Sequence, residues 1–349
     1  MFGSGALRRA VSRVPRLSAS GIWRQLVSAS LILVLSLLPL VHAKPLAAKR
    51  KILFIASYHV EKGEWTAGIK AGIEGVLSRR ADVSLELFNM DTRLSKSDAE
   101  KEAAALRAKQ VIERVKPDVV ITSDDNAAKF LILPYFKNAD LPFVFCGVNW
   151  DASVYGLPYR NTTGMIEIQL IDKIVDYLSP LARGGRLAAL RGDTLTNRKE
   201  QQHFERHLGR SMSTAYVENI RQWREAFVSL QRDADILILG SLRALDLEGV
   251  AMAEIEAFAR EHTRIPTASY DAFMNRVALL TLSTLPREQG EWAAGKALEI
   301  LDGTPPNLIP VVSNRKAKIF LNMTLSKILG IRMPMELIEI SHLVDGREP

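Results

Sequence analysis

The chain has 349 residues, of which 47% are apolar, and this is enough to fill one large or two medium hydrophobic cores. Five of its 46 basic residues precede residue 44, so the formal net charge of +7 falls to +2 in the remainder (41 basic and 39 acidic residues), and no nucleic-acid-binding face is indicated. Cys146 is the only cysteine, which excludes an intrachain disulfide and a cysteine-based zinc site.

Residues 1–43 have the pattern of an export signal. A segment with five arginines precedes an apolar run at residues 26–41, and Val41 and Ala43 are the small residues of a cleavage site. The run is short for a membrane span, and no cysteine follows it that could carry a lipid anchor. We expect a periplasmic protein without membrane insertion after signal cleavage; an uncleaved signal that tethers the protein to the membrane is the alternative.

After residue 50 the sequence alternates between apolar runs and amphipathic segments. Continuous apolar runs are typical of strands buried on both faces, and residues with helical spacing follow them. In the first half, strands are predicted at residues 51–57, 83–90, 118–123 and 141–147. Helices are predicted at residues 66–80 and 97–115, and another helix precedes the fourth strand.

The same alternation begins again after the segment NTTG at residues 161–164. Strands are predicted at residues 186–192, 214–220, 234–241 and 265–271. Helices are predicted at residues 198–210, 223–233 and 250–262. Two successive sets of alternating strands and helices favour parallel sheets covered by helices on both sides, so the predicted fold class is α/β with two Rossmann-like lobes.

Polar and aromatic residues follow most of these strands. Ligands of open parallel sheets bind beyond the carboxyl ends of the strands, and two such sheets facing each other form a cleft that can close by a hinge motion. In the first lobe the candidate ligand-binding residues are Ser57, Tyr58, His59, Trp65, Ser123, Asp124, Asp125, Asn126, Gly147 and Asn149. In the second lobe they are Asp193, Thr194, Ser241, Tyr270 and Asp271.

Three of these residues, Ser123, Asp124 and Asp125, stand at the start of a predicted helix. At least one of them is expected to cap that helix, because Ser and Asp side chains accept hydrogen bonds from its free N–H groups. Two adjacent carboxylates are more than one cap requires, and the second could hold an ammonium group of a ligand. Packing or local chain geometry is the alternative role of four further candidates, namely Tyr58, Trp65, His59 and Asn149.

Motifs of catalysis are absent from the sequence after residue 43. His203 and His207 have the spacing of zinc ligands on a helix, but Phe204 stands where a metalloprotease has Glu, and a solvated helix face is favoured. The sequence has no G-x-S-x-G elbow, no Walker loop and no G-x-G-x-x-G turn. We therefore expect no catalytic residue, no metal, no cofactor and no enzymatic activity.

Four segments together resemble one protein family. They are S-Y-H-x(5)-W-T from residue 57, M-D-T-R from residue 90, S-D-D-N-A from residue 123 and V-F-C-G-V-N from residue 144. From about residue 50 to the C-terminus the chain resembles the ABC transporter substrate-binding proteins of the periplasmic-binding-protein-like type I fold, in particular the group related to tryptophan and tyrosine uptake proteins. The four segments look like one branch of this family, whose members also occur as the input domain of sensor kinases.

The resemblance implies two lobes joined by three crossovers, near residues 161–164, 281–285 and 304–310, with the ligand held between the lobes. The implied domains are a signal peptide (1–43), a first lobe (50–162 plus 285–304) and a second lobe (163–284 plus 305–345). The helix at residues 288–301 would return to the first lobe.

The function implied by the resemblance is that of a periplasmic solute-binding protein. It would close on a small molecule, such as an amino acid or an aromatic compound, and deliver it to an ABC permease, its expected partner, while itself remaining a monomer. The alternative is a receptor of the same fold that reports ligand binding to a histidine kinase or a diguanylate cyclase.

Overall fold

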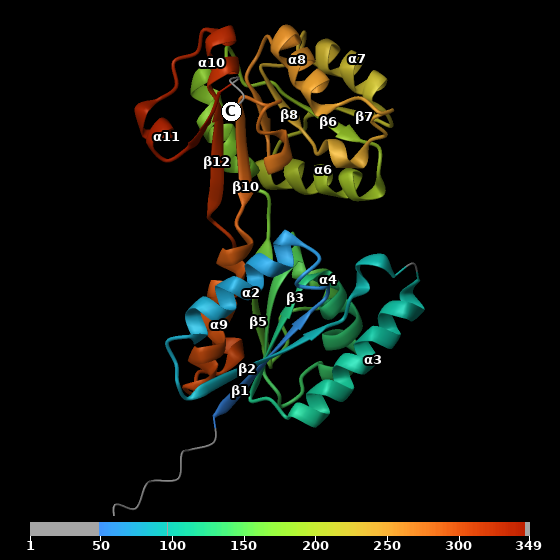
Figure 1. Ribbon diagram of the computed structural model, residues 1–349, viewed down its shortest axis with the longest axis vertical. Coiled ribbons are helices and arrows are strands. Elements are labelled where there is room, and N and C mark those ends of the chain that lie inside the picture. Colours follow the sequence, from blue (N-terminus) through green and yellow to red (C-terminus); the bar gives the residue numbers. More distant parts are fainter. Residues whose placement is uncertain (1–48, 96, 346–349) are drawn as a thin grey trace, which may run out of the picture. The chain divides into compact units, whose positions relative to one another are not determined.

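The computed structural model describes residues 49–95 and 97–345 (Figure 1). The predicted export signal at residues 1–43 lies outside these ranges and stays a prediction. No helix in the described ranges is both long and apolar enough to cross a membrane.

Within the described residues, the first sheet has six strands in the order β11-β5-β4-β3-β1-β2, and all of its pairs are parallel. The strands are β1 Arg50–Ala56, β2 Val83–Asn89, β3 Val119–Ser123, β4 Phe143–Asn149, β5 Thr162–Glu167 and β11 Val312–Ser313. The helices are α2 Glu64–Leu77, α3 Asp98–Val115, the short α4 Asp124–Ala127, which continues as a π-helix over Ala128–Phe136, and α9 Pro286–Leu301.

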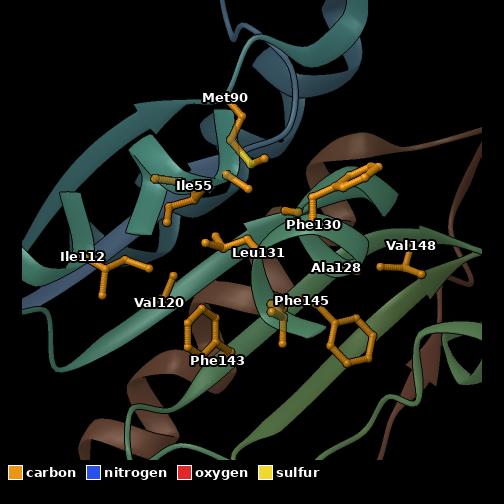
Figure 2. Close-up of a cluster of buried hydrophobic side chains, with 14 of the residues drawn as sticks. Ile55, Met90, Ile112, Val120, Ala128, Phe130, Leu131, Phe143, Phe145 and Val148 are labelled. Carbon is orange, nitrogen blue, oxygen red and sulfur yellow. The ribbon is translucent and has the colours of Figure 1, made fainter. Parts of the chain in front are cut away.

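Alternating residues of the central strands fill two separate cores, because successive side chains of a strand point to opposite faces. Leu53 and Ile55 of β1 belong to the core on the side of α3 and the π-helix, which Figure 2 shows. Ile52 and Phe54 belong to the core on the side of α2 and α9. Both faces of the sheet are therefore covered, which explains why its central strands β1, β3 and β4 are largely apolar.

The second sheet, again within the described residues, has seven strands in the order β13-β12-β10-β9-β8-β6-β7. The strands are β6 Leu187–Gly192, β7 Ser213–Val217, β8 Ile236–Leu239, β9 Thr267–Ser269, β10 Leu280–Thr284, β12 Ala317–Asn322 and β13 His342–Val344. The helices are α5 Ile171–Leu178, α6 Leu195–Leu208, α7 Ile220–Leu230, α8 Met252–His262, α10 Met323–Leu329 and α11 Met335–Glu339. Short 3₁₀ turns lie at Thr92–Leu94, Ala152–Tyr155, Ser179–Leu181, Leu242–Ala244, Ala272–Met274 and Pro306–Leu308.

Helix α9 follows β10 of the second sheet in sequence but packs against α2 of the first (Figure 1). Two glycines permit this close packing. A Cβ atom at Gly290 would overlap the carbonyl oxygen of Ile69, and a Cβ atom at Gly72 would overlap the carbonyl oxygen of Arg287. The backbones of the two helices are thus in direct contact, which anchors the returning segment in the first lobe.

The predicted α/β fold with two mostly parallel sheets is confirmed, and the eight predicted strands are all present. The positions of two crossovers are corrected. Residues 161–164 lie at the start of β5 rather than in a connection, because residues 162–167 pair with β4, and the chain leaves the first sheet only after Glu167. The last crossing follows β11, after Ser313, and not residues 304–310. Strand β12 was not predicted; it is antiparallel to β10. The domain boundaries stay a prediction.

Candidate ligand-binding site

The carboxyl ends of β1, β3 and β4 lie next to one another in the first sheet, because β3 pairs with both of the other strands. The buried hydroxyl of Ser57 donates to the carbonyl oxygen of Ser123 over 2.5 Å and accepts from the backbone N–H of Ala127 over 2.9 Å. Asn126 Nδ2 donates to Thr92 Oγ1 over 2.9 Å, and Thr92 Oγ1 donates to the carbonyl oxygen of Ser57 over 2.7 Å. Ser57 and Asn126 therefore fix the start of α4 against the end of β1.

Asp124, the first residue of α4, has a left-handed backbone (φ 67°) and is only 5% exposed. Trp65 Nε1 donates to Asp124 Oδ1 over 3.1 Å, whereas Oδ2 has no hydrogen-bond partner among the described residues. Burial raises the pKa of Asp124 to about 7; the Ser123 hydroxyl and the Trp65 N–H lower this pKa, and the charge of Asp125 raises it. The Ser123 hydroxyl lies near this carboxyl group, yet its Oγ makes no hydrogen bond that meets the distance and angle criteria within residues 49–95 and 97–345.

Asp125 is half-buried and accepts two hydrogen bonds. Asn149 Nδ2 donates to its Oδ2 over 2.5 Å, and the Tyr155 hydroxyl donates to its Oδ1 over 2.9 Å. The expectation that Ser123, Asp124 or Asp125 caps the helix is therefore wrong. The Ser123 side chain makes no capping bond, and the two carboxylates accept from side chains rather than from the free N–H groups of α4.

Glu167 ends β5 and brings a third carboxyl group to this place. It is half-buried by exposed area, yet protein atoms surround its carboxyl group, and this desolvation, followed by the charges of Asp124, Asp125 and Glu200, raises its pKa well above the usual range. Burial, followed by the charges of Asp124, Asp125 and Glu167, raises the pKa of Tyr58. We call Asp124, Asp125 and Glu167 the acidic cluster.

Gly147 of β4 keeps space for the Trp65–Asp124 hydrogen bond. Its φ is +66°, and a Cβ atom here would lie 3.3 Å from Asp124 Oδ1 and 3.6 Å from Trp65 Nε1. Its N–H donates over 3.0 Å to Oε1 of Gln289, a buried residue of α9. His59 is not joined to this group by a hydrogen bond; its Nδ1 accepts from the N–H of Glu61 within a local turn.

The second-lobe candidates are engaged in contacts within their own lobe. Asp193 accepts from Arg198 in a bidentate ion pair with two distances of 2.8 Å. The hydroxyl of Thr194 caps α6. Ser241 Oγ donates to Asp271 Oδ2 over 2.5 Å.

Tyr270, the remaining second-lobe candidate, belongs to a buried ionic network around Arg191. Its hydroxyl donates to Glu200 Oε2 over 2.7 Å, and Arg191 Nη1 donates to the same oxygen over 2.5 Å. Arg191 is only 1% exposed, its Nε donates to Gln201 Oε1 over 2.7 Å, and its guanidinium lies 4.4 Å from the centre of the Phe204 ring. Its Nη2 has no partner among the described residues.

One aromatic contact joins the segment after β4 to helix α6. The rings of Trp150 and His203 are stacked, with centroids 5.3 Å apart and an interplanar angle of 12°. Desolvation, followed by the charge of Arg206, lowers the pKa of His203. His203 thus packs on an aromatic ring, and the described residues contain no group of three or more His, Cys, Asp or Glu side chains arranged to hold a metal ion.

Several residues of these networks were not predicted, among them Thr92, Tyr155, Glu167, Arg191 and Glu200. Glu167 was missed because residues 162–167 were not predicted to form a strand, so the position of Glu167 at a strand end was not recognised. Arg191 could have been found, since a basic residue within the apolar strand at residues 187–192 needs a buried partner. Tyr155 lies only a few residues beyond the end of β4.

The comparisons with known proteins agree with this architecture. The family model of the ABC transporter substrate binding protein matches residues 67–344. No curated protein matches the chain. Similar solved structures include an ABC domain in complex with L-Trp from Streptococcus pneumonia (16% identity, 85% of this chain and 100% of that chain, TM-score 0.53) and the ligand-free, open CD0873 of Clostridium difficile, a substrate binding protein with adhesive properties (16% identity, 85% and 100%, TM-score 0.64). A LacI transcriptional regulator from Lactobacillus brevis is similar as well (13% identity, 77% and 99%, TM-score 0.51). Because the family model covers most of its length, the chain belongs to the ABC transporter substrate-binding protein family.

Proposed function

We propose that the protein is an exported solute receptor that closes on a small organic molecule and delivers it to an ABC permease. The observation that carries the proposal is the acidic cluster at the carboxyl ends of the first sheet, within a chain of the substrate-binding family. Buried polar atoms at strand ends, two of them unpartnered, suit a site that a ligand completes. The L-Trp complex of a similar structure supports a ligand of the size of an amino acid.

The solute must contact residues of both lobes for the protein to close. A ligand shifts the equilibrium between the open and closed states only if it binds the closed state more tightly than the open state. The first lobe would offer Tyr58, Trp65 and the acidic cluster. The second lobe would offer residues of its own strand ends, with Thr194 and Tyr270 among them. Binding needs no catalytic step.

A thermal-shift panel of amino acids, aromatic acids, amines, nucleosides and small peptides tests the proposal on protein purified after export from a bacterial host. A solute at a hundredfold excess over Kd stabilises the protein by about 2.7 kcal/mol, which raises the melting temperature by roughly 2 °C or more. A selective response is expected. Protein that mass spectrometry shows to be free of co-purified ligand and that responds to no solute would contradict the proposal.

Uptake separates transport from sensing. Deletion of the gene is expected to abolish uptake of the radiolabelled solute, and the gene should lie beside those of a permease and an ATPase. Normal uptake, together with a neighbouring kinase or cyclase gene, would assign the protein to signalling.

A further inference from the structure

The acidic cluster also bears on the charge of the solute. Building on the proposed function, we propose that the solute is an organic cation, an amine or amidine of net positive charge, whose charged group lies against Asp124, Asp125 and Glu167 of the first lobe.

Two buried polar atoms in this region have no hydrogen-bond partner within the part of the chain that the structure describes. Ser123 is fully buried and its Oγ has no partner, and Asp124 is 5% exposed with its Oδ2 unpartnered. Buried polar atoms in proteins are normally paired, with protein groups, water or a ligand. The carboxylate oxygen of Asp124 accepts hydrogen bonds and the hydroxyl of Ser123 can both accept and donate one, whereas an ammonium or amidinium group only donates them. A cationic group therefore complements both atoms at once.

Carboxyl groups outnumber basic groups near the cluster. Three carboxyl groups act on the hydroxyl of Tyr58, and one basic residue, Arg93, acts in the opposite sense. Arg93 is exposed, so water screens its charge. The carboxyl groups of the cluster also repel one another, and Glu200 adds to the repulsion on Glu167. A positive charge among them would relieve this repulsion.

The arginines near the strand ends of the second lobe are largely engaged already, and Nη2 of Arg191, which has no partner among the described residues, belongs to a side chain that is only 1% exposed. Within the described residues, three arginines near these strand ends already lie close to acidic side chains: Arg191 to Glu200 (2.5 Å), Arg198 to Asp193 (2.8 Å) and Arg243 to Asp271 (3.9 Å). The carboxylate of a zwitterion would have to displace one of these pairs or reach Nη2 of the buried Arg191. A solute of net positive charge has no such cost.

Aromatic side chains border the cluster and suit an organic cation rather than a bare metal ion. Trp65 donates to Asp124, Tyr155 donates to Asp125, and the hydroxyl of Tyr58 is influenced by all three carboxyl groups. Cations are attracted to the faces of aromatic rings, and the attraction is stronger where water is excluded. Alkyl or aryl carbons of an amine would also bury apolar area against these rings.

Matched compounds that differ only in charge test the inference. The thermal shift of the exported protein is measured with tryptamine, tryptophan and indole-3-acetate, with tyramine, tyrosine and 4-hydroxyphenylacetate, and with agmatine and arginine, all at equal millimolar concentration, and with CaCl₂ as a metal probe. At least one amine or amidine should raise the melting temperature clearly above its zwitterionic or anionic partner.

Variants then locate the charged group by calorimetric titration with the compound that responds. Asp125→Asn and Glu167→Gln should each weaken its binding about tenfold or more, because each removes a carboxylate that faces the cation. Asp140→Asn, which changes a fully exposed carboxylate of the same lobe, should leave the affinity unchanged.

A response confined to zwitterionic, anionic or neutral compounds, or to Ca²⁺, would overturn the inference and leave the receptor function in place. An amine that binds with equal affinity to Asp125→Asn, Glu167→Gln and wild type would overturn the placement of its charge. If nothing in this set or in the wider panel stabilises ligand-free protein, both the inference and the receptor function fail.

Discussion

The indole Nε1 of Trp65 donates a hydrogen bond to Oδ1 of Asp124 over 3.1 Å. The bond joins α2 to the first residue of α4, and Gly147 of β4 leaves the space that it needs. It also places a fluorescent side chain in contact with a buried carboxyl group whose pKa is about 7. The protonation of Asp124 therefore affects both the stability of the protein and a spectroscopic signal that can be followed.

The first prediction concerns stability and pH. Because the pKa of Asp124 is raised from its usual value of 3.8 to about 7 on folding, the native state binds this proton more tightly than the unfolded state. The contribution of Asp124 to the free energy of unfolding must then fall as pH rises from about 4 to 7 and stay constant above. At pH 8 the ionisation of Asp124 lowers the free energy of unfolding by on the order of 4 kcal/mol relative to the protein with Asp124 protonated, since one unit of pKa shift corresponds to about 1.4 kcal/mol.

Asp124→Asn removes this titration while keeping an oxygen that accepts from Trp65. Urea unfolding should show the variant to be more stable than wild type at pH 8, with the difference shrinking as pH falls toward 4. Asn also tolerates the left-handed backbone at this position. A constant difference across this pH range would refute the assignment of the titration to Asp124.

The second prediction is that the fluorescence emission of Trp65 reports both the ionisation of Asp124 and the binding of the solute. In the absence of solute the fluorescence of the wild type should change with pH around a midpoint of about 7, since ionisation of Asp124 places a charge beside the indole N–H. Binding of the solute should change the same emission. Trp65→Phe should abolish both signals and Asp124→Asn the pH signal, whereas Trp292→Phe, in α9, should retain both. Signals that survive in Trp65→Phe would mean that another tryptophan reports them.

The third prediction separates binding from folding at Asp125. Asp125→Ala should abolish solute binding and leave the melting temperature of the unliganded protein within a few degrees of wild type. The hydrogen bonds lost come from Tyr155 and from the exposed Asn149, and such bonds contribute only about 1 kcal/mol each. Asp140→Ala is the matched control, because that carboxylate is fully exposed. Solute affinity equal to that of wild type would remove Asp125 from the site.

The sequence predicts the strands well because parallel strands covered on both faces are continuous apolar runs, as in β1, β3 and β8. Strand β5 was missed because its sequence begins with two threonines and a glycine after Asn161, which is also typical of a connection. Gly164 is required there for a different reason, since a Cβ atom would overlap the ring of Phe145. Strand β12 depends on pairing with β10, more than thirty residues earlier, and no local pattern indicates such pairing.

The candidate site was predictable where chemistry follows a recognised strand. Trp65, Asp124, Asp125, Gly147 and Asn149 are brought together, because β1, β3 and β4 are neighbours in one sheet. The bonding within this group was not predictable: two adjacent carboxylates suggested a helix cap, and only the left-handed backbone of Asp124 directs its side chain toward Trp65 instead. Glu167 depends on β5 and was lost with it.

The last prediction concerns the buried ion pair of the second lobe. Arg191→Met should lower the free energy of unfolding by about 3–5 kcal/mol, because the carboxylate of Glu200 then remains in a largely buried position without its cation. In Arg191→Met/Glu200→Gln that uncompensated charge is gone, and an amide oxygen can still accept from the Tyr270 hydroxyl. The double variant should thus be more stable than Arg191→Met alone. Urea unfolding of the wild type, both single variants and the double variant should give a coupling energy of at least about 1 kcal/mol. Additive effects would instead mean that Glu200 is stabilised mainly by solvent and by Tyr270, and that the 2.5 Å contact with Arg191 contributes little to folding.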